Sequence, residues 1–276
     1  MTSIRFCLCL VIVAAVSCAP QQAPTQPSSP APGTPVRILV FNIHAGMDAA
    51  GVSNLDRVAD LIRSTDTDVA LLQEVDKGTK RSGGVDQLAV ISKRLGYVPA
   101  FGKSLNYDGG EYGLGAISRR GFTAHFTTLL PVAPSQARAG GSHESRAALT
   151  VVPVAGLKLV ALNTHLDASR EETYRLQEIE TVLKLVGNNR KSGLPAVAGG
   201  DFNAEPASAV YRRILDSGLR DAWTECGKGE GLTYPANKPV KRIDYLFLAD
   251  PLQCSDARVI ETTISDHRPL LVTVHR

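Results

Sequence analysis

Residues 36–43 read VRILVFNI and residues 69–75 read VALLQEV, and these two stretches decide the fold class. Each is an apolar run of strand length that ends beside a polar side chain, Asn42 in the first and Glu74 in the second. Between them apolar residues recur at helical spacing, at Leu55, Val58, Ala59 and Ile62. Strand, helix and strand in this order indicate a parallel pair of buried strands, because parallel neighbours are usually joined by a helical crossover.

The remaining segments extend this unit into a larger α/β (α+β) fold. A second helix is predicted at residues 87–95, and a third at residues 170–186, with Gly187 as its stop signal. After Gly96 the pattern changes to strands separated by glycine-rich turns, which is typical of antiparallel neighbours. These strands read GAISR, FTAHFTTLL, RAALTVVPV and LKLVALNTH, and later ones read PAVAGG, RIDYLFLA and RPLLVTV.

We therefore expect residues 36–276 to form one domain, in which two packed sheets are flanked by helices. No repeat and no second low-complexity segment interrupts this region. The net charge of +3 and the charged fraction of 21% are those of an ordinary globular protein. They exclude a strongly polybasic binder of nucleic acid.

The N-terminus has the pattern of an export signal. Residues 1–17 hold one cation, Arg5, and then the apolar run FCLCLVIVAAV, which is shorter than the roughly 20 residues that span a bilayer. The stretch AAVSC resembles the bacterial lipobox, in which cleavage leaves a cysteine that is acylated, here Cys18. Ala15 stands where that motif more often has leucine, so an ordinary secretory signal cut near Ala15 or Ser17 is the alternative. A transmembrane anchor is the weaker interpretation.

Residues 18–35 contain six prolines and no charged or large apolar side chain. Such a segment cannot bury enough surface to order itself, so it is interpreted as a tether. Cys226 and Cys254 are the cysteines that remain in the folded region. In an exported protein they can form a disulfide, and the alternative is a pair of buried thiols. The sequence thus predicts an exported protein, lipid-anchored to a bacterial cell envelope through Cys18.

Polar side chains recur where the predicted strands end, and strand ends lift side chains into a shared crevice. Carboxylate and amide oxygens suit Mg²⁺ or Mn²⁺, whereas the paired cysteines of a zinc site and the GxSxG motif of a serine hydrolase are missing. Taken singly, each of these residues could form a turn or a cap. The set comprises Asn42, Glu74, His165, Asp201, Asn203, Asp244, Asp266 and His267.

Eight ordered motifs then resemble the endonuclease/exonuclease/phosphatase superfamily over nearly all of residues 36–276. They read FNIH, LLQEV, GEYG, ESR, NTHLD, GGDFN, RIDYLF and SDHRPL. This resemblance implies a four-layer αββα sandwich of two mixed, mainly antiparallel sheets. It also implies metal-dependent hydrolysis of phosphate esters with Mg²⁺ or Mn²⁺.

The resemblance also implies roles for the metal-facing residues. Glu74 corresponds to the principal metal ligand, with Asn42 and Asp266 beside it. Asp201 and Asn203 would orient or activate the attacking water, hold a phosphate oxygen or contact a second metal ion.

Further roles concern proton transfer and the phosphate. His267, paired with Asp244, would act as general base or phosphate donor, because a carboxylate fixes the tautomer of an imidazole. His165 would face the leaving group. Arg146 resembles the family's phosphate-facing arginine.

Three other side chains are harder to interpret from sequence. Tyr112 is expected to support the site through its hydroxyl group, and His44 is interpreted as structural or supporting. Arg81 follows Glu74 in a loop with Lys77 and Lys80, where it could receive a substrate phosphate. That loop could equally be a solvated surface segment.

The sequence therefore predicts an exported, metal-dependent phosphodiesterase that acts as a monomer on a small-molecule, lipid-borne or nucleic-acid phosphate ester. One alternative is an extracytoplasmic, deoxyribonuclease-like endonuclease, which the low charge and the 5% of aromatic residues disfavour. The other is a noncatalytic surface binding module of the same fold. The complete set of polar residues argues against that second alternative.

Overall fold

The computed structural model describes residues 31, 33–135 and 145–276. The predicted signal segment, Cys18 and most of the predicted tether lie outside the described residues. Within the described part of the chain, no helix has both the length and the apolar character that crossing a membrane requires.

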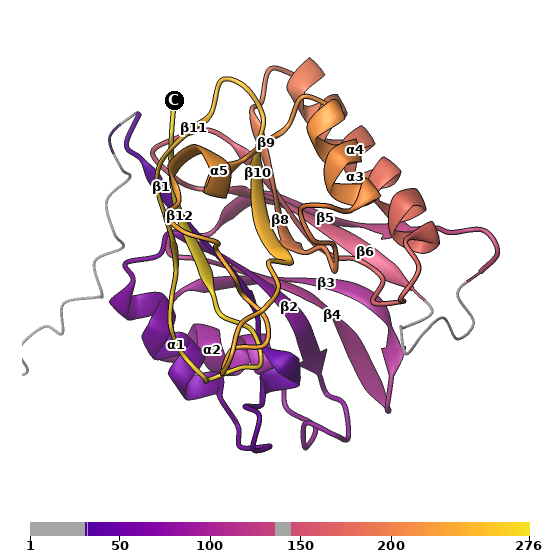
Figure 1. Cartoon of the computed structure of the whole chain (residues 1–276). Helices are drawn as coiled ribbons and strands as arrows, with labels where there is room; N and C mark the ends of the chain where they lie inside the picture. The colour runs from indigo at the N-terminus through magenta and orange to yellow at the C-terminus, as the bar shows by residue number, and fades with distance from the viewer. Residues whose placement is uncertain (1–30, 32, 136–144) are drawn as a thin grey trace, which may run out of the picture.

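Two six-stranded sheets pack face to face, with helices on their outer surfaces (Figure 1). The first sheet has the order β11 (Gln253–Val259), β12 (Leu270–His275), β1 (Val36–Asn42), β2 (Val69–Lys77), β4 (Gly110–Ser118) and β3 (Val98–Tyr107). The second has the order β5 (Phe122–Leu130), β6 (Arg146–Pro153), β7 (Val160–His165), β8 (Ala196–Asp201), β10 (Asp244–Leu248) and β9 (Arg220–Asp221). The αββα sandwich implied by the resemblance is confirmed.

The helices are α1 (Leu55–Ser64), α2 (Gln87–Leu95), α3 (Thr173–Lys191), α4 (Ala209–Asp216) and α5 (Ala222–Cys226), with a short 3-10 turn, η1 (His44–Gly46). In each sheet one pair of described neighbours is parallel, β1 with β2 and β7 with β8, and the other pairs are antiparallel. Helices α1 and α3 are the two crossovers. The carboxyl ends of each parallel pair therefore meet at one edge of their sheet.

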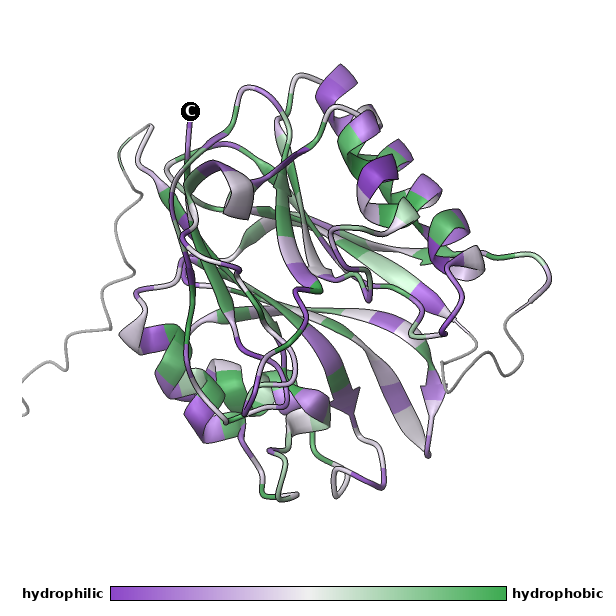
Figure 2. Cartoon of the chain, viewed as in Figure 1, coloured by the Kyte–Doolittle hydropathy of each residue, from purple (hydrophilic) through white to green (hydrophobic). Residues whose placement is uncertain are grey.

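Three groups of buried apolar side chains correspond to the three interfaces between the four layers. One fills the space between the sheets, with Val40, Leu71 and Leu246 among its members. A second lies under α1 and α2, and a third under α3 and α4. Figure 2 shows the same pattern, with the outward sides of α3 and α4 mainly hydrophilic. The core thus holds both sheets as rigid supports for the side chains at their ends.

The structure corrects some expected boundaries. Helix α3 begins at Thr173 and passes through Gly187, so the predicted stop at that glycine is wrong. The helix ends where Gly193 adopts a φ of +76°, a conformation that suits glycine after a helix. Strand β3 and helices α4 and α5 were not predicted. A disulfide joins Cys226 to Cys254, with 5.9 Å between the Cα atoms, which resolves the alternative left open by the sequence.

Candidate active site

The end of the β1–β2 pair presents Asn42 and Glu74. Asn42 is the last residue of β1, and the pairing of β2 with β4 shifts register between Leu72 and Val75, which is a bulge. Within that bulge Glu74 has a φ of +57°, a strained conformation of the kind that clusters at functional sites. The Asn42 amide donates to Glu74 Oε1 (3.0 Å) and to Asp201 Oδ2 (3.1 Å). Asn42 thereby links the two sheets at the site.

The β7–β8 pair ends in His165 and Asp201, which are opposite each other in register. Asp201 Oδ1 accepts from the amide of Asn203 (2.9 Å), which has a φ of +47°. The Asn203 side chain lies 3.1 Å from His165 Nε2 and donates to Leu166 O. Gly200 precedes Asp201 with a φ of +147°, and a Cβ atom there would lie 1.9 Å from a backbone oxygen of β7. This close approach requires glycine.

Asp244 and His267 form the predicted pair. Asp244 opens β10 opposite Asp201, and its Oδ2 lies 2.8 Å from His267 Nδ1. His267 Nε2 then faces Asp201 Oδ2 at 3.6 Å. Ser265 Oγ donates to Asn42 O (2.7 Å) and so fixes the loop that carries His267. The ring of Tyr234 packs on the imidazole with centroids 4.7 Å apart.

Electrostatics favour a charged imidazole between two carboxyl groups. Burial and the charge of Asp244 raise the pKa of Asp201 to about 7, although His267 opposes this shift. Burial lowers the pKa of His267, but the charges of Asp244 and Asp201 outweigh burial and raise that pKa to about 10. A proton is therefore held on His267, where it can be directed to an anion.

Two neighbouring groups could hold a divalent cation. Asp201, Asp244 and His267 bring one ligand atom each within 4.8 Å of one another, and Asp244 Oδ1 is buried without a partner among the described residues. His267 would have to give up its proton to ligate a metal in this group. Glu74 and Asp266 also line the cavity, and the Asp266 side chain is 29% exposed, so these two carboxylates are more accessible. Asp266 Oδ2 lies 4.0 Å from His44 Nε2. Oxygen donors of this kind fit a hard cation.

The carboxylates face a common cavity. Burial raises the pKa of Tyr234, and the charges of Asp266, Asp201 and Glu74 raise it further, so all three carboxylates lie near this one phenol. The Asn42 side chain places its amide nitrogen toward Glu74, while its oxygen accepts from the backbone amide of His44 (3.0 Å). Direct ligation of a metal by Asn42 would thus require rotation of the amide.

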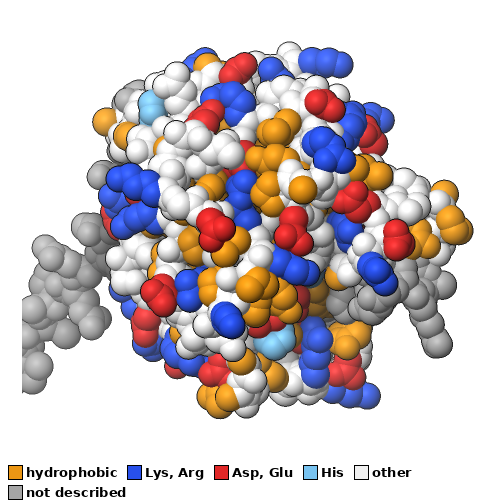
Figure 3. Space-filling view, viewed as in Figure 1, with side chains coloured by type: hydrophobic (Ala, Val, Ile, Leu, Met, Phe, Trp, Pro, Cys, Tyr) orange, Lys and Arg blue, Asp and Glu red, His pale blue; other side chains and the backbone are white. Residues whose placement is uncertain are grey.

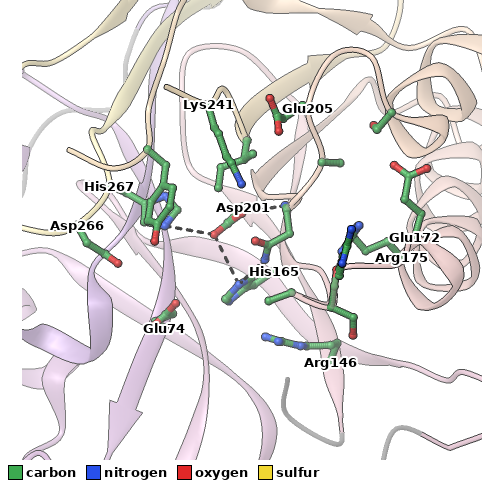
Figure 4. A pocket seen from close by; sticks show the side chains of 18 of the residues that line it. Glu74, Arg146, His165, Glu172, Arg175, Asp201, Glu205, Lys241, Asp266 and His267 are labelled. Carbon is green, nitrogen blue, oxygen red and sulfur yellow. Dashed lines mark hydrogen bonds and ion pairs between the residues drawn. The ribbon is translucent and has the colours of Figure 1, made fainter. Parts of the chain in front are cut away.

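The cavity has a volume of about 1050 Å³, and Figure 4 shows Asp201 near its middle. Arg146 and Tyr112 line it, as do Arg81 and His165. The Tyr112 hydroxyl lies 3.5 Å from His165 Nδ1, a contact that fits its expected supporting role. Most of the sequence-predicted residues line this one cavity. Asn42 and Asp244 do not line it but are hydrogen-bonded to lining residues, and Cys18 lies outside the described residues.

Arg81 lies at the cavity but is already engaged. Its Nε and Nη2 atoms donate to the two oxygens of buried Asp76, at 2.7 and 2.8 Å, and its guanidinium stacks 4.6 Å from the centroid of Tyr107. Lys77 pairs with Glu111 at 3.7 Å. This loop is consequently an ordered wall of the cavity, and its arginine is less available to a phosphate than the sequence suggested.

Sequence reasoning missed several lining residues, and four of them carry polar or charged groups. Tyr234 and Lys241 come from the segment before β10, and Glu172 and Arg175 from the start of α3. None follows a predicted strand, so the search at strand ends could not find them. Arg175 stood inside a predicted helix, and a charged residue there is normally interpreted as solvent-exposed.

Comparisons with known proteins agree with this architecture. Residues 39–267 match the sequence model of the Endonuclease/Exonuclease/phosphatase family. The Uncharacterized protein YbhP of Escherichia coli is 22% identical over 250 residues, which cover 87% of this chain and 96% of the relative.

Solved structures share the fold at low identity. The mannosyl-6-phosphatase Bt3783 of Bacteroides thetaiotaomicron is 20% identical, with a TM-score of 0.72 over 87% of this chain and all of the other. The human Nocturnin catalytic domain, solved with bound sulfate anion, is also 20% identical, with a TM-score of 0.66 over 87% of this chain and 93% of the other. At these identities the likeness to solved structures shows the fold.

Proposed function

Because the chain belongs to the endonuclease/exonuclease/phosphatase family, we propose that it is an exported, metal-dependent hydrolase of phosphate esters that prefers diesters. The observation that carries this proposal is the line formed by Asp244, His267 and Asp201 beside the carboxylate of Glu74. It combines proton-transfer groups with oxygen ligands in one cavity. A phosphate ester needs both, because an anion must be approached by a nucleophile.

Each residue of the line has a distinct role in the proposal. Asp244 orients His267 and stabilises its protonated form, so that His267 Nε2 donates to an oxygen of the substrate phosphate. Asp201 accepts the proton of the attacking water, since its raised pKa makes it a carboxylate of suitable basicity near neutral pH. Asn203 orients the same water or the phosphate. His165 lies across Asp201 and can protonate the leaving oxygen.

Glu74 and Asp266 would hold Mg²⁺ or Mn²⁺, with Asn42 adjacent. When bound, such an ion supplies positive charge to the phosphate oxygens and lowers the pKa of water. The protein's own contribution is to hold Glu74 rigidly: the bulge in β2 sets the direction of its side chain, and Asn42 donates to it.

The preference for diesters is inferred from the cavity. Lining side chains continue beyond Asp201 in both directions, toward Asp266 and Lys241 on one side and toward Arg175 and Glu172 on the other (Figure 4). Substituents on two oxygens of one phosphate can therefore be accommodated. On the face seen in Figure 3, cationic and anionic side chains are intermixed, which favours a compact ester over duplex nucleic acid.

The test compares bis-nitrophenyl phosphate with nitrophenyl phosphate, plasmid DNA and sphingomyelin, each with Mg²⁺, Mn²⁺ or chelator. We expect chelator-sensitive turnover, with the highest kcat/KM for bis-nitrophenyl phosphate and a kcat lowered by orders of magnitude in His267→Ala. Absence of metal-dependent turnover of every substrate would favour a noncatalytic binding module. Efficient nicking of plasmid DNA would favour the endonuclease alternative.

Export and lipid anchoring through Cys18 are part of the proposal. The disulfide between Cys226 and Cys254 supports export, because disulfides persist mainly in oxidising compartments. Whole-mass analysis of the mature protein tests the anchor. An acylated chain beginning at Cys18 is expected, and an unmodified cysteine would refute lipidation while leaving export open to cell fractionation.

A further inference from the structure

Two arginines that line the cavity have donors that meet no acceptor in the described part of the chain. Arg146 is 2% exposed, and its Nε and Nη1 atoms are buried without a hydrogen-bond partner among the described residues. Arg175 is 5% exposed, and its Nε atom is in the same state. A buried guanidinium is costly unless it is paired and hydrogen-bonded. Both therefore point to an anion that completes them.

The two guanidinium groups share one end of the cavity. In Figure 4 both lie on the α3 side of the pair formed by Asp201 and His267, with Arg146 reaching toward Glu74 and Arg175 beside Glu172. The positive charges of Arg146 and Arg175 both act on the same buried carboxyl group, Glu178, so they belong to one electrostatic neighbourhood.

Acidic groups near them leave this charge incompletely balanced. Burial raises the pKa of Glu178 to about 7, so this carboxyl is only partly ionised at neutral pH. Glu172 Oε2 accepts from the amide of Ala209 at the start of α4 (3.0 Å). This contact of Glu172 is made to a backbone amide and not to an arginine.

Arg175 is also fixed in place. Its Nη1 atom donates to the backbone oxygens of Asp167 (3.0 Å) and Ser169 (2.5 Å), in the segment that follows β7. These bonds use one nitrogen and hold the planar group rigidly. A rigid guanidinium loses little entropy when it binds, and its donors match the oxygens of a phosphate.

We propose that Arg175, with Arg146 between it and the reaction centre, forms a second anion subsite. The substrate would then carry a phosphate group in addition to the ester that is hydrolysed. This inference rests on the proposed function and narrows its substrate class to compounds with two phosphates. The ester would lie at Asp201 and His267, and the second phosphate at the amino end of α3.

A series of non-hydrolysable ligands of increasing length tests the second anion subsite by binding alone, without turnover. Binding of α,ω-alkylene bisphosphonates with one to six methylene groups is measured by calorimetry in the presence of Mg²⁺, beside alkyl monophosphonates of equal length. We expect one chain length to bind at least about tenfold more tightly than its monophosphonate, because a second charge-assisted pair forms. If no bisphosphonate binds the native chain more tightly than the monophosphonate of equal length, the subsite is refuted.

Variants locate the effect. Arg175→Gln is expected to reduce the bisphosphonate preference to within about threefold of the monophosphonate, and Arg190→Gln, exposed on the same helix, should retain it. If Arg175→Gln does not fold, Arg175→Lys keeps one charge without the planar fork and should retain only part of the preference. Full preference in either Arg175 variant would overturn the assignment. The proposed function would be overturned instead if the native chain showed no metal-dependent turnover of nitrophenyl esters, so the two failures are distinguishable.

Discussion

The units β1–α1–β2 and β7–α3–β8 are built alike and end differently. Each is a parallel pair with a helical crossover, and each places two polar side chains at one sheet edge. The first ends in Glu74, which is half-buried and has a left-handed backbone conformation. The second ends in His165 and Asp201, which are 7% and 2% exposed. One architecture thus supplies an accessible ligand on one side and buried proton-transfer groups on the other.

The two crossover helices also differ in the side chains that they bury. Helix α1 buries only apolar side chains, whereas α3 buries Arg175 and Glu178 near its amino end. Helix α1 therefore only covers its sheet, while α3 covers its sheet and also forms a wall of the cavity. Buried charge on a crossover helix marks the unit where substrate is expected to bind.

The largest expected effect concerns the buried side of this comparison. His267→Ala should lower kcat by about 10²–10⁴-fold, the usual contribution of acid–base catalysis, because Asp244 and Asp201 lose the imidazole between them. Steady-state kinetics on bis-nitrophenyl phosphate measure this loss, and circular dichroism checks the fold. His125→Ala, exposed on β5, is the matched control. A folded variant with near-normal kcat would remove His267 from the mechanism.

A change at Glu74, the accessible ligand, should alter how much metal the activity requires. Glu74→Gln removes a carboxylate charge but keeps its shape, so we expect the Mg²⁺ concentration for half-maximal activity to rise about 10–100-fold. Saturating metal should restore much of kcat, unlike the His267 variant. Activity is titrated with Mg²⁺ for both proteins. An unchanged metal requirement would show that Asp201, Asp244 and His267, rather than Glu74, provide the metal site.

The buried charge on α3 should appear in the pH dependence of stability. The pKa of Glu178 is near the ordinary glutamate value of 4.5 in the unfolded chain, and burial raises it to about 7 in the fold. Between these values the folded state holds a proton that the unfolded state has lost, so stability falls as pH rises and is constant above that window. The loss is about 3 kcal/mol.

Glu178→Gln should remove this fall in stability between pH 5 and pH 7, because glutamine does not titrate. The variant keeps the side-chain oxygen that accepts from the amide of Asp167, so the fold should be preserved. Denaturant unfolding at pH 5 and pH 8 measures the difference between the variant and the native chain. Glu171→Gln, exposed before α3, is the control. Equal pH dependence in native chain and variant would mean that Glu178 is ionised at little cost.

The sequence predicted the parts that follow from periodicity and strand ends. The runs at residues 36–43 and 69–75 predicted β1 and β2, and the resemblance predicted the sandwich. The end of α3 was predicted wrongly at Gly187, because the backbone of this glycine remains helical. Packing along α3 therefore overrides a weak stop signal. Arg175 and Glu178 were missed because helical periodicity records which face is apolar and cannot reveal charged side chains that are buried by the tertiary fold.

The smallest expected effect concerns Arg81, the cavity arginine of the first sheet. Unlike Arg146, it already binds a carboxylate, since two of its nitrogens donate to buried Asp76. Arg81→Lys keeps a cation against Asp76, and so we expect KM to rise less than about threefold with kcat unchanged, as for a partner already engaged in a salt bridge. Lys80→Gln, exposed in the same loop, provides the baseline. A tenfold rise in KM would instead place Arg81 on the substrate phosphate, and the contrast between engaged and unpaired arginines would no longer predict where the substrate binds.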